Sequence, residues 1–156
     1  MPLRAHAKTV VSSLVRRGET VSVAESVTAG GLGNAITTAP GASQVFLGGV
    51  IAYSNNVKVN ILGVDPELIE KFNVVSEEVA CAMADAVRSK FGTTWGIATT
   101  GIAGPGDFKG IAEGTVWVAI SGPVNQSIQL QLDSGREAIR TGAISSAIGT
   151  FARILS

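Results

Sequence analysis

A serine in a run of small residues is the first candidate for chemistry in this sequence. Ser26 lies in the segment AESVTAGG (24–31), which follows a β-branched run and has the polar opening of a helix. At a strand-to-helix turn, the Ser26 hydroxyl can act as a nucleophile. Main-chain amides around Thr28, Gly30 and Gly31 could receive the developing negative charge, and the glycines would let a ligand approach the backbone. The alternative is that Ser26 or Thr28 only caps the helix.

Tyr53 and Lys58 form the second candidate, in the segment GGVIAYSNNVK (48–58). A lysine can serve as a general base when desolvation or a neighbouring cation lowers its pKa, and Tyr53 could then pass a proton or orient the hydroxyl. The alternative is a phenol at a strand end and a solvated helix lysine. Because the chain contains one histidine, His6, and one cysteine, Cys81, Lys58 is the leading candidate base.

Other polar groups also follow predicted strands. The segment TTGIAGPG (99–106) could hold a ligand through the Thr100 hydroxyl and the amides near Gly101 and Gly104, or it could be only a turn. It matches neither the dinucleotide fingerprint nor the P-loop, which have other glycine spacings. Glu25, before the candidate serine, is either a surface charge or a partner for an incoming amide or hydroxyl.

Two arginines stand four residues apart at the start of the last predicted helix. Arg136 and Arg140 would share one face there, although cations oppose the macrodipole at a helix start. An anion bound at this point, a phosphate or a carboxylate, would explain them. The alternative is pairing with Asp133, Glu137 or Glu113.

Composition excludes several classes of function. The 156 residues include 12 basic and 12 acidic side chains, so we expect no nucleic-acid partner and no membrane surface. No apolar run of signal-peptide or membrane-span length occurs, and the single cysteine suits a reducing compartment, so we expect a cytoplasmic protein. The acidic residues lack ligand spacing, which predicts no metal site. Because only 15% of the residues are charged, we expect a homodimer or a larger homo-oligomer.

Hydrophobic periodicity predicts one α/β domain over residues 1–156, with a mixed sheet in a layered fold and helices on both faces. The apolar run 45–54 is expected to be a central strand, and 126–132 a strand at an edge or with a wet face. Ser134-x-x-Glu137 predicts a capping box that opens the last helix. The remaining predicted strands are 20–26, 94–100 and 114–121, and the predicted helices are 3–17, 28–39, 56–62, 66–72, 77–91 and a last one to about 154.

Six motifs in one order make the sequence similar to the CinA C-terminal domain family, and together they extend over nearly the whole chain. They are AESVTAGG (24–31), PGAS (40–43), FLGGVIAYSNNVKVNILGV (46–64), VSEEVACAMA (75–84), TGIAGPG (100–106) and GTVWVAI (114–120). The resemblance implies a stand-alone deamidase-type domain without the N-terminal domain of longer members. It also implies hydrolysis of nicotinamide mononucleotide (NMN) to nicotinic acid mononucleotide and ammonia, with no metal or redox cofactor.

The resemblance also implies roles for particular residues. Ser26 would be the attacking or activating hydroxyl, and Tyr53 and Lys58 its partners in proton transfer. The residues that would line the site and bind or orient NMN are Ser43, Thr100 and Arg140.

The chain departs from the family pattern at three places. Val27 stands where the family usually has cysteine, and Ala29 where it usually has glycine, but neither replaces the hydroxyl or the lysine. After Gly106 the chain reads DFKGIAE (107–113) in place of the usual glycines and Pro-Glu-Lys, so the contacts of this loop, and any substrate preference that they set, can differ from those of the family. A non-catalytic nucleotide-binding module of the same fold, and an oligomeric scaffold with a vestigial pocket, stay open as alternatives.

Overall fold

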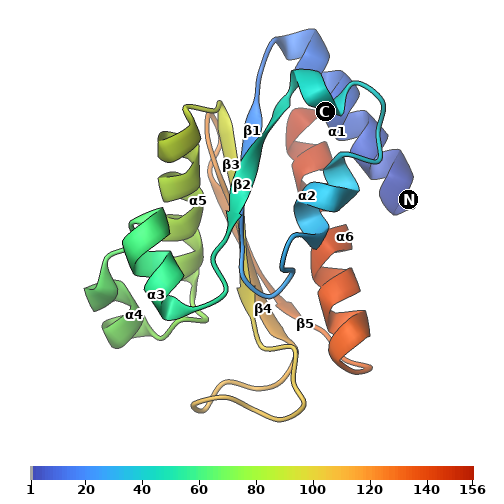
Figure 1. Ribbon diagram of the computed structural model, residues 1–156. Helices are drawn as coiled ribbons and strands as arrows, with labels where there is room; N and C mark the ends of the chain where they lie inside the picture. The colour runs from blue at the N-terminus through green and yellow to red at the C-terminus, as the bar shows by residue number, and fades with distance from the viewer. Residues whose placement is uncertain (1) are drawn as a thin grey trace.

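A computed structural model of the protein describes residues 2–156. Its centre is one five-stranded mixed sheet in the order β2-β1-β3-β4-β5 (Figure 1). The first three strands of that order are parallel, and β4 and β5 continue the sheet antiparallel. The strands are β1 (Val21–Glu25), β2 (Phe46–Ile51), β3 (Trp95–Gly101), β4 (Thr115–Ser121) and β5 (Gln126–Gln131).

Helices cover both faces of the sheet, which confirms the predicted α/β class (Figure 1). One face carries α1 (Leu3–Arg17), α2 (Gly31–Ile36) and α6 (Arg136–Leu155). The other face carries α3 (Asn55–Val57), the π-helix η2 (Lys58–Leu62), α4 (Pro66–Phe72) and α5 (Glu77–Phe91). A short 3₁₀ turn, η1 (Ala42–Gln44), precedes β2. Among the residues described, no helix has the length and apolar character needed to cross a membrane.

Each layer of helices packs on its own side of the sheet. All five residues of β1 and the first six of β3 are buried, as expected for parallel strands covered on both faces. On the α1–α6 side, Trp95 packs edge-on against Phe151 with their ring centroids 5.3 Å apart. On the α5 side, Gly96 allows the backbone of α5 to approach β3. The two strands that lead to the candidate site are therefore held firmly.

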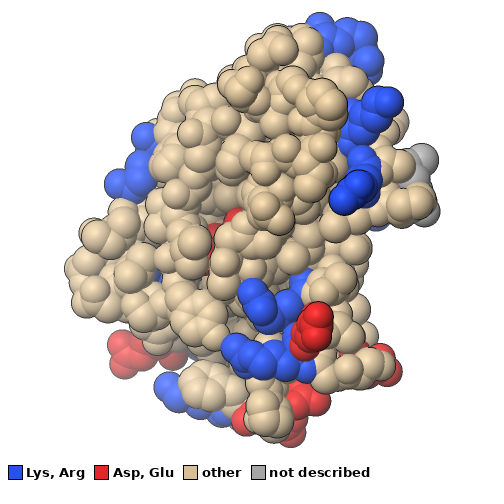
Figure 2. All heavy atoms as spheres, turned by 45° about the vertical axis from the view of Figure 1, so that its right-hand side comes forward, with Lys and Arg blue, Asp and Glu red and all other residues tan. Residues whose placement is uncertain are grey.

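Strand β2 differs from its prediction as a central strand. It lies at one edge of the sheet, and its exposure alternates, with Leu47 53% and Ile51 56% exposed. Among residues 2–156 no strand pairs with its outer side, so the apolar content that suggested burial on both faces partly faces outward. Figure 2 shows wide uncharged surface across the upper and middle part of the view, with Lys and Arg at both margins and charges of both signs toward the lower end. The homo-oligomer stays a prediction.

The predicted capping box at the last helix is wrong. Helix α6 begins at Arg136 after Gly135, whose φ is 93°, and no side chain caps it. Ser134 also has a positive φ of 75°, and its hydroxyl donates to the Asp133 carboxylate at 3.1 Å. Two successive residues in this unusual conformation direct the Ser134 side chain away from the first amides of the helix.

The prediction of an edge strand for residues 126–132 is confirmed. Strand β5 lies at the edge of the sheet opposite β2.

The close packing of α5 on β3 predicts that Gly96→Ala lowers the free energy of unfolding by about 1–3 kcal/mol. The added Cβ would collide with the Ala84 carbonyl oxygen and would lie 2.9 Å from the Arg88 Cβ, both parts of α5. Gly142→Ala in α6 is the matched control, because its Cβ would meet only Leu132 methyl groups at 3.2–3.3 Å and helix propensity favours alanine. Urea unfolding measures both variants. Equal stability of the two would contradict the close approach of α5.

Candidate functional site

A cavity of about 510 Å³ opens at the carboxyl ends of β1 and β3. Strand β1 lies between β2 and β3, and the connections that follow β1 and β2 cross opposite faces of the sheet, the arrangement in which open α/β sheets bind ligands (Figure 1). The walls come from the residues after β1, the turn after β2, the loop after β3 and the first turn of α6. The lining residues are Ser26, Val27, Tyr53, Ser54, Asn55, Lys58, Val74, Val75, residues 100–108 and Arg136.

Ser26 and Lys58 meet in the wall of this cavity. The Lys58 Nζ lies 3.1 Å from the Ser26 Oγ and donates to the Tyr53 carbonyl oxygen at 3.0 Å. Lys58 is 1% exposed and Ser26 is 8% exposed, so both groups are nearly free of bulk water. Ser26 directly follows β1, and its amide donates to the Thr99 carbonyl of β3. Lys58 begins the π-helix η2, an irregular turn frequent at functional sites.

Burial lowers the pKa of Lys58 to about 8. The physical cause is desolvation, which penalises the charged ammonium relative to the neutral amine. At pH 7 roughly a tenth of the molecules would hold a neutral amine at such a pKa. A neutral Lys58 can accept the proton of the Ser26 hydroxyl, so the pair has the elements of an activated nucleophile.

Tyr53 contributes to this pair through its backbone and not through its phenol. Its side chain is 57% exposed, and its hydroxyl accepts a hydrogen bond from the Arg136 guanidinium at 3.1 Å. The carbonyl oxygen of Tyr53 is the group that contacts Lys58. The structure therefore brings Tyr53 to the cavity, with its phenol on the side of Arg136.

Glu25 is neither a surface charge nor a partner for an incoming amide or hydroxyl, because its buried carboxylate binds the first amides of α2. Its carboxylate accepts hydrogen bonds from the amides of Leu32 and Gly33 at 2.7 and 2.9 Å and from the Thr28 hydroxyl at 2.6 Å. Thr28 also bonds the Thr99 hydroxyl at 2.8 Å and is fully buried. The Thr28 side chain is thus used to hold the turn after β1, beside the cavity and not in its lining.

The glycines of the two predicted loops lie in different places, and only those of the second loop line the candidate site. Gly30 faces Ile51 in a second cavity of about 300 Å³ beside β2, and Gly31 packs under Ile144 of α6. Gly101 and Gly104 do line the candidate site. Thr100 lines it too, and its hydroxyl donates to the Val74 carbonyl oxygen at 3.0 Å.

Ser43 and Arg140 lie outside the cavity lining. Ser43 belongs to η1, before the first residue of β2, and it borders a different cavity near the opposite end of the sheet. Arg140 donates to the carbonyl oxygens of Val27 and Thr28 at 3.1 and 3.4 Å, so it braces the turn that carries Ser26. The structure brings neither side chain to the Ser26–Lys58 pair.

Arg136, and not Arg140, is the arginine that lines the cavity. Its guanidinium donates to the Gly104 carbonyl oxygen at 2.6 Å and to the Tyr53 hydroxyl. The pairing of either arginine with Asp133, Glu137 or Glu113 that the sequence allowed is absent. Within residues 2–156, the salt bridge shorter than 4 Å is Arg17–Glu19.

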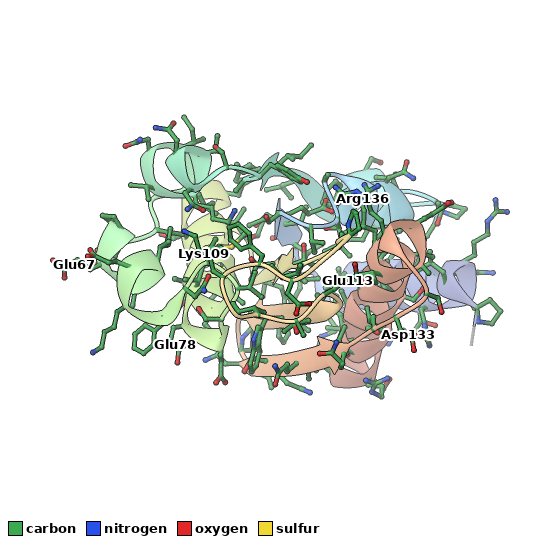
Figure 3. The ribbon with its side chains drawn as sticks, turned by 90° about the horizontal axis from the view of Figure 1, so that it is seen from below. Glu67, Glu78, Lys109, Glu113, Asp133 and Arg136 are labelled. Atoms are coloured by element: carbon green, nitrogen blue, oxygen red, sulfur yellow. The ribbon has the colours of Figure 1, made fainter. Side chains whose placement is uncertain are left out.

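The loop after β3 is organised by two of its own carboxylates. The Glu113 carboxylate accepts from the Gly106 amide, and the Asp107 carboxylate accepts from the Glu113 amide, each at 2.8 Å. Figure 3 looks onto this end of the sheet and shows the loop between the two helical layers, with Lys109 and Arg136 on opposite sides. Phe108, 45% exposed, lines the cavity from the loop.

Sequence reasoning missed several members of the cavity wall. Phe108 lies in the segment that departs from the family pattern, and that departure was the one signal of its position. Val74 and Val75 precede the Ser76 cap of α5, with no pattern to mark them as lining. Asn55 and Ser54 begin the short helix α3, where polar residues are ordinary.

The described residues were also compared with what a reactive cysteine or a metal site requires. Burial, together with the nearby carboxylates of Glu77 and Asp85, raises the pKa of the Cys81 thiol, so it stays protonated. Within residues 2–156, no three His, Cys, Asp or Glu side chains gather in a group that could hold a metal ion.

Comparison with known proteins agrees with this architecture. The family description "CinA C-terminal domain" matches residues 3–155. A "CinA-like protein" of Synechocystis sp. is 54% identical over 139 residues, which are 84% of this chain and 33% of that protein. A "putative competence-damage inducible protein" of Desulforudis audaxviator is 43% identical over 143 residues, 90% of this chain and 35% of that protein. The chain spans about a third of the length of these relatives.

Solved structures share the fold over almost their whole length. A competence or damage-inducible protein of Enterobacter asburiae superposes with a TM-score of 0.97 at 27% identity, covering 100% of this chain and 99% of that one. The corresponding protein of Agrobacterium tumefaciens gives a TM-score of 0.94 at 28% identity, covering 99% and 96%. The chain belongs to the CinA C-terminal domain family.

Proposed function

We propose that this chain is an amidohydrolase that converts NMN to nicotinic acid mononucleotide and ammonia. One observation carries the proposal: a buried lysine with a pKa lowered to about 8 contacts a serine hydroxyl in the wall of a ligand-sized cavity. The motif resemblance supplies the identity of the substrate. A volume of about 510 Å³ lies within the range of small-molecule sites.

The chemistry follows from this pair of groups. Neutral Lys58 takes the proton of the Ser26 hydroxyl as the oxygen attacks the carboxamide carbon of NMN. The resulting ammonium then protonates the departing nitrogen, so the C–N bond breaks and ammonia leaves an acyl ester on Ser26. Lys58 then takes a proton from water as its oxygen attacks the ester carbon, and returns that proton to the Ser26 oxygen as the ester C–O bond breaks. The nicotinic acid product leaves and loses its carboxyl proton to solvent.

The surroundings of the pair support this sequence of steps. The Tyr53 carbonyl fixes the Nζ position at 3.0 Å, and the Arg140 bonds to the carbonyls of Val27 and Thr28 fix the turn that carries Ser26. Val27 also lines the cavity and directly follows Ser26 in the chain, which makes its main-chain amide a candidate donor to the oxyanion. Holding both reacting groups on separate, rigid elements reduces the entropy cost of bringing them together.

Removing either member of the pair tests the proposal directly. Ser26→Ala and Lys58→Ala are expected to lower kcat for ammonia release from NMN by about 10³-fold or more, because nucleophile or base is lost. Ser12→Ala and Lys8→Ala, on the exposed face of α1, are the matched controls and should keep full activity. Full activity in either site variant would refute the mechanism. Stabilisation by NMN without turnover in the unaltered protein would instead favour the nucleotide-binding module.

The lowered lysine pKa sets the expected pH dependence. Because the base works in its neutral form, kcat/KM should rise as pH increases through about 8 and then level off. Lys58→Arg should be inactive over the same range, since a guanidinium stays protonated. A steady-state profile from pH 6 to 10 checks both statements. A flat profile for the unaltered protein would argue against Lys58 as the base.

The same pKa shift predicts how stability changes with pH. Unfolded Lys58 titrates near 10.5 and folded Lys58 near 8, so the penalty for its burial is full below pH 8 and is relieved as pH rises toward 10.5. The free energy of unfolding, relative to that of Lys58→Met, should therefore rise by about 2–3 kcal/mol across this window. Lys8→Met, at an exposed position of α1, is the control and should show no such trend. Denaturant unfolding at pH 7, 8, 9 and 10 measures the difference.

A further inference from the structure

We propose that Arg136 and the Tyr53 phenol form a seat for the phosphate of a mononucleotide, so that the site selects phosphorylated substrates over the corresponding nucleosides. The inference rests on the proposed function for the identity of the nucleotide. Its structural basis is a cation in the cavity wall that has no carboxylate within 4 Å among residues 2–156.

The guanidinium of Arg136 is held in place and keeps donors to spare. It uses one N–H for the Gly104 carbonyl oxygen at 2.6 Å and another for the Tyr53 hydroxyl at 3.1 Å. A guanidinium has five N–H donors, so three remain for a ligand. No carboxylate lies within 4 Å of it among residues 2–156. An anion could therefore bind without first displacing an ion pair.

The Tyr53 phenol adds a neutral donor beside that charge. Its oxygen accepts from Arg136, so its own proton is free to point at a ligand oxygen. Both side chains line the same cavity as Ser26. A planar guanidinium next to a hydroxyl matches the several acceptor oxygens of a phosphate better than it matches a neutral sugar.

The other charged groups near the cavity do not compete for this role. Lys58 is buried at the reacting end against Ser26, whereas Arg136 is exposed at the rim. The acidic residue of the lining, Asp107, has its carboxylate bonded to the Glu113 amide of its own loop. Lys109 lies on the other side of that loop from Arg136 and stacks on Phe108 (Figure 3). The cavity thus separates a buried amine for proton transfer from an exposed cation for recognition.

Selectivity between NMN and nicotinamide riboside, which lacks the phosphate, tests the inference. The binding test uses Ser26→Ala protein, which is expected to hold either ligand without turnover, and isothermal titration gives the two Kd values. NMN should bind about 10–100-fold more tightly than the riboside, from one or two charge-assisted hydrogen bonds. Adding Arg136→Gln should remove most of that preference without weakening riboside binding, and adding Tyr53→Phe should reduce it by a smaller factor.

Two further variants test whether the preference for NMN comes from the Arg136 guanidinium itself or from positive charge near the cavity in general. Arg136→Lys keeps the charge but loses the planar fork, and should retain an intermediate preference. Lys109→Gln removes a positive charge from the loop after β3 at a position outside the cavity lining, and should change the preference less than about twofold, as expected for a screened exposed charge. Thermal unfolding of each variant establishes that it is folded.

The outcomes separate this inference from the proposed function. Equal affinity for NMN and riboside, no measurable affinity for NMN, or a preference that survives Arg136→Gln would overturn the phosphate seat, even if the protein hydrolyses NMN. A preference for NMN that Arg136→Gln abolishes would uphold the seat, even if the unaltered protein releases no ammonia. In that case only the amidase would be refuted.

Discussion

The burial of one lysine amine against one serine hydroxyl is the constraint on which the site depends. Lys58 is 1% exposed and has three points of support: the Ser26 oxygen, the Tyr53 carbonyl and the π-helix that it opens. Burying an ammonium is costly, and the protein meets that cost in part by lowering the pKa to about 8. The instability of the charged form is therefore also the reason that part of the Lys58 population is neutral, and able to accept a proton, near pH 8.

Around that pair, most charged and polar side chains serve to hold backbone. Glu25 binds the first amides of α2, Arg140 binds two carbonyls of the turn after Ser26, and Glu113 binds an amide of the Gly-rich loop. Such contacts fix loops that would otherwise be free to move, and a hydroxyl can be placed accurately only on a fixed turn. Arg136 differs because it lines a ligand-sized space and its two hydrogen bonds leave three N–H donors unused.

Much of this arrangement could be predicted from patterns in the sequence. The apolar periodicities predicted a mixed sheet with helices on both faces. Ser26, Lys58 and Thr100 each follow a predicted strand, and the structure places all three in the lining of one cavity at the carboxyl ends of the strands. The errors have local causes. Strand β2 is apolar but has no outer neighbour, so composition alone suggested a central position. Ser134 has the right spacing for a cap, yet its positive φ turns the hydroxyl elsewhere.

By itself, the sequence determined the fold class and reduced the candidate bases to a lysine, because periodicity and the near absence of histidine are properties of a linear chain. Only the tertiary structure decided which polar groups share a cavity. It brought Lys58 to Ser26 across 32 positions and Arg136 to Tyr53 across 83, while Arg140 and Glu25 were drawn into supporting the backbone. The physical reason is that burial and hydrogen-bond partners depend on packing between distant segments, which spacing along one segment does not encode.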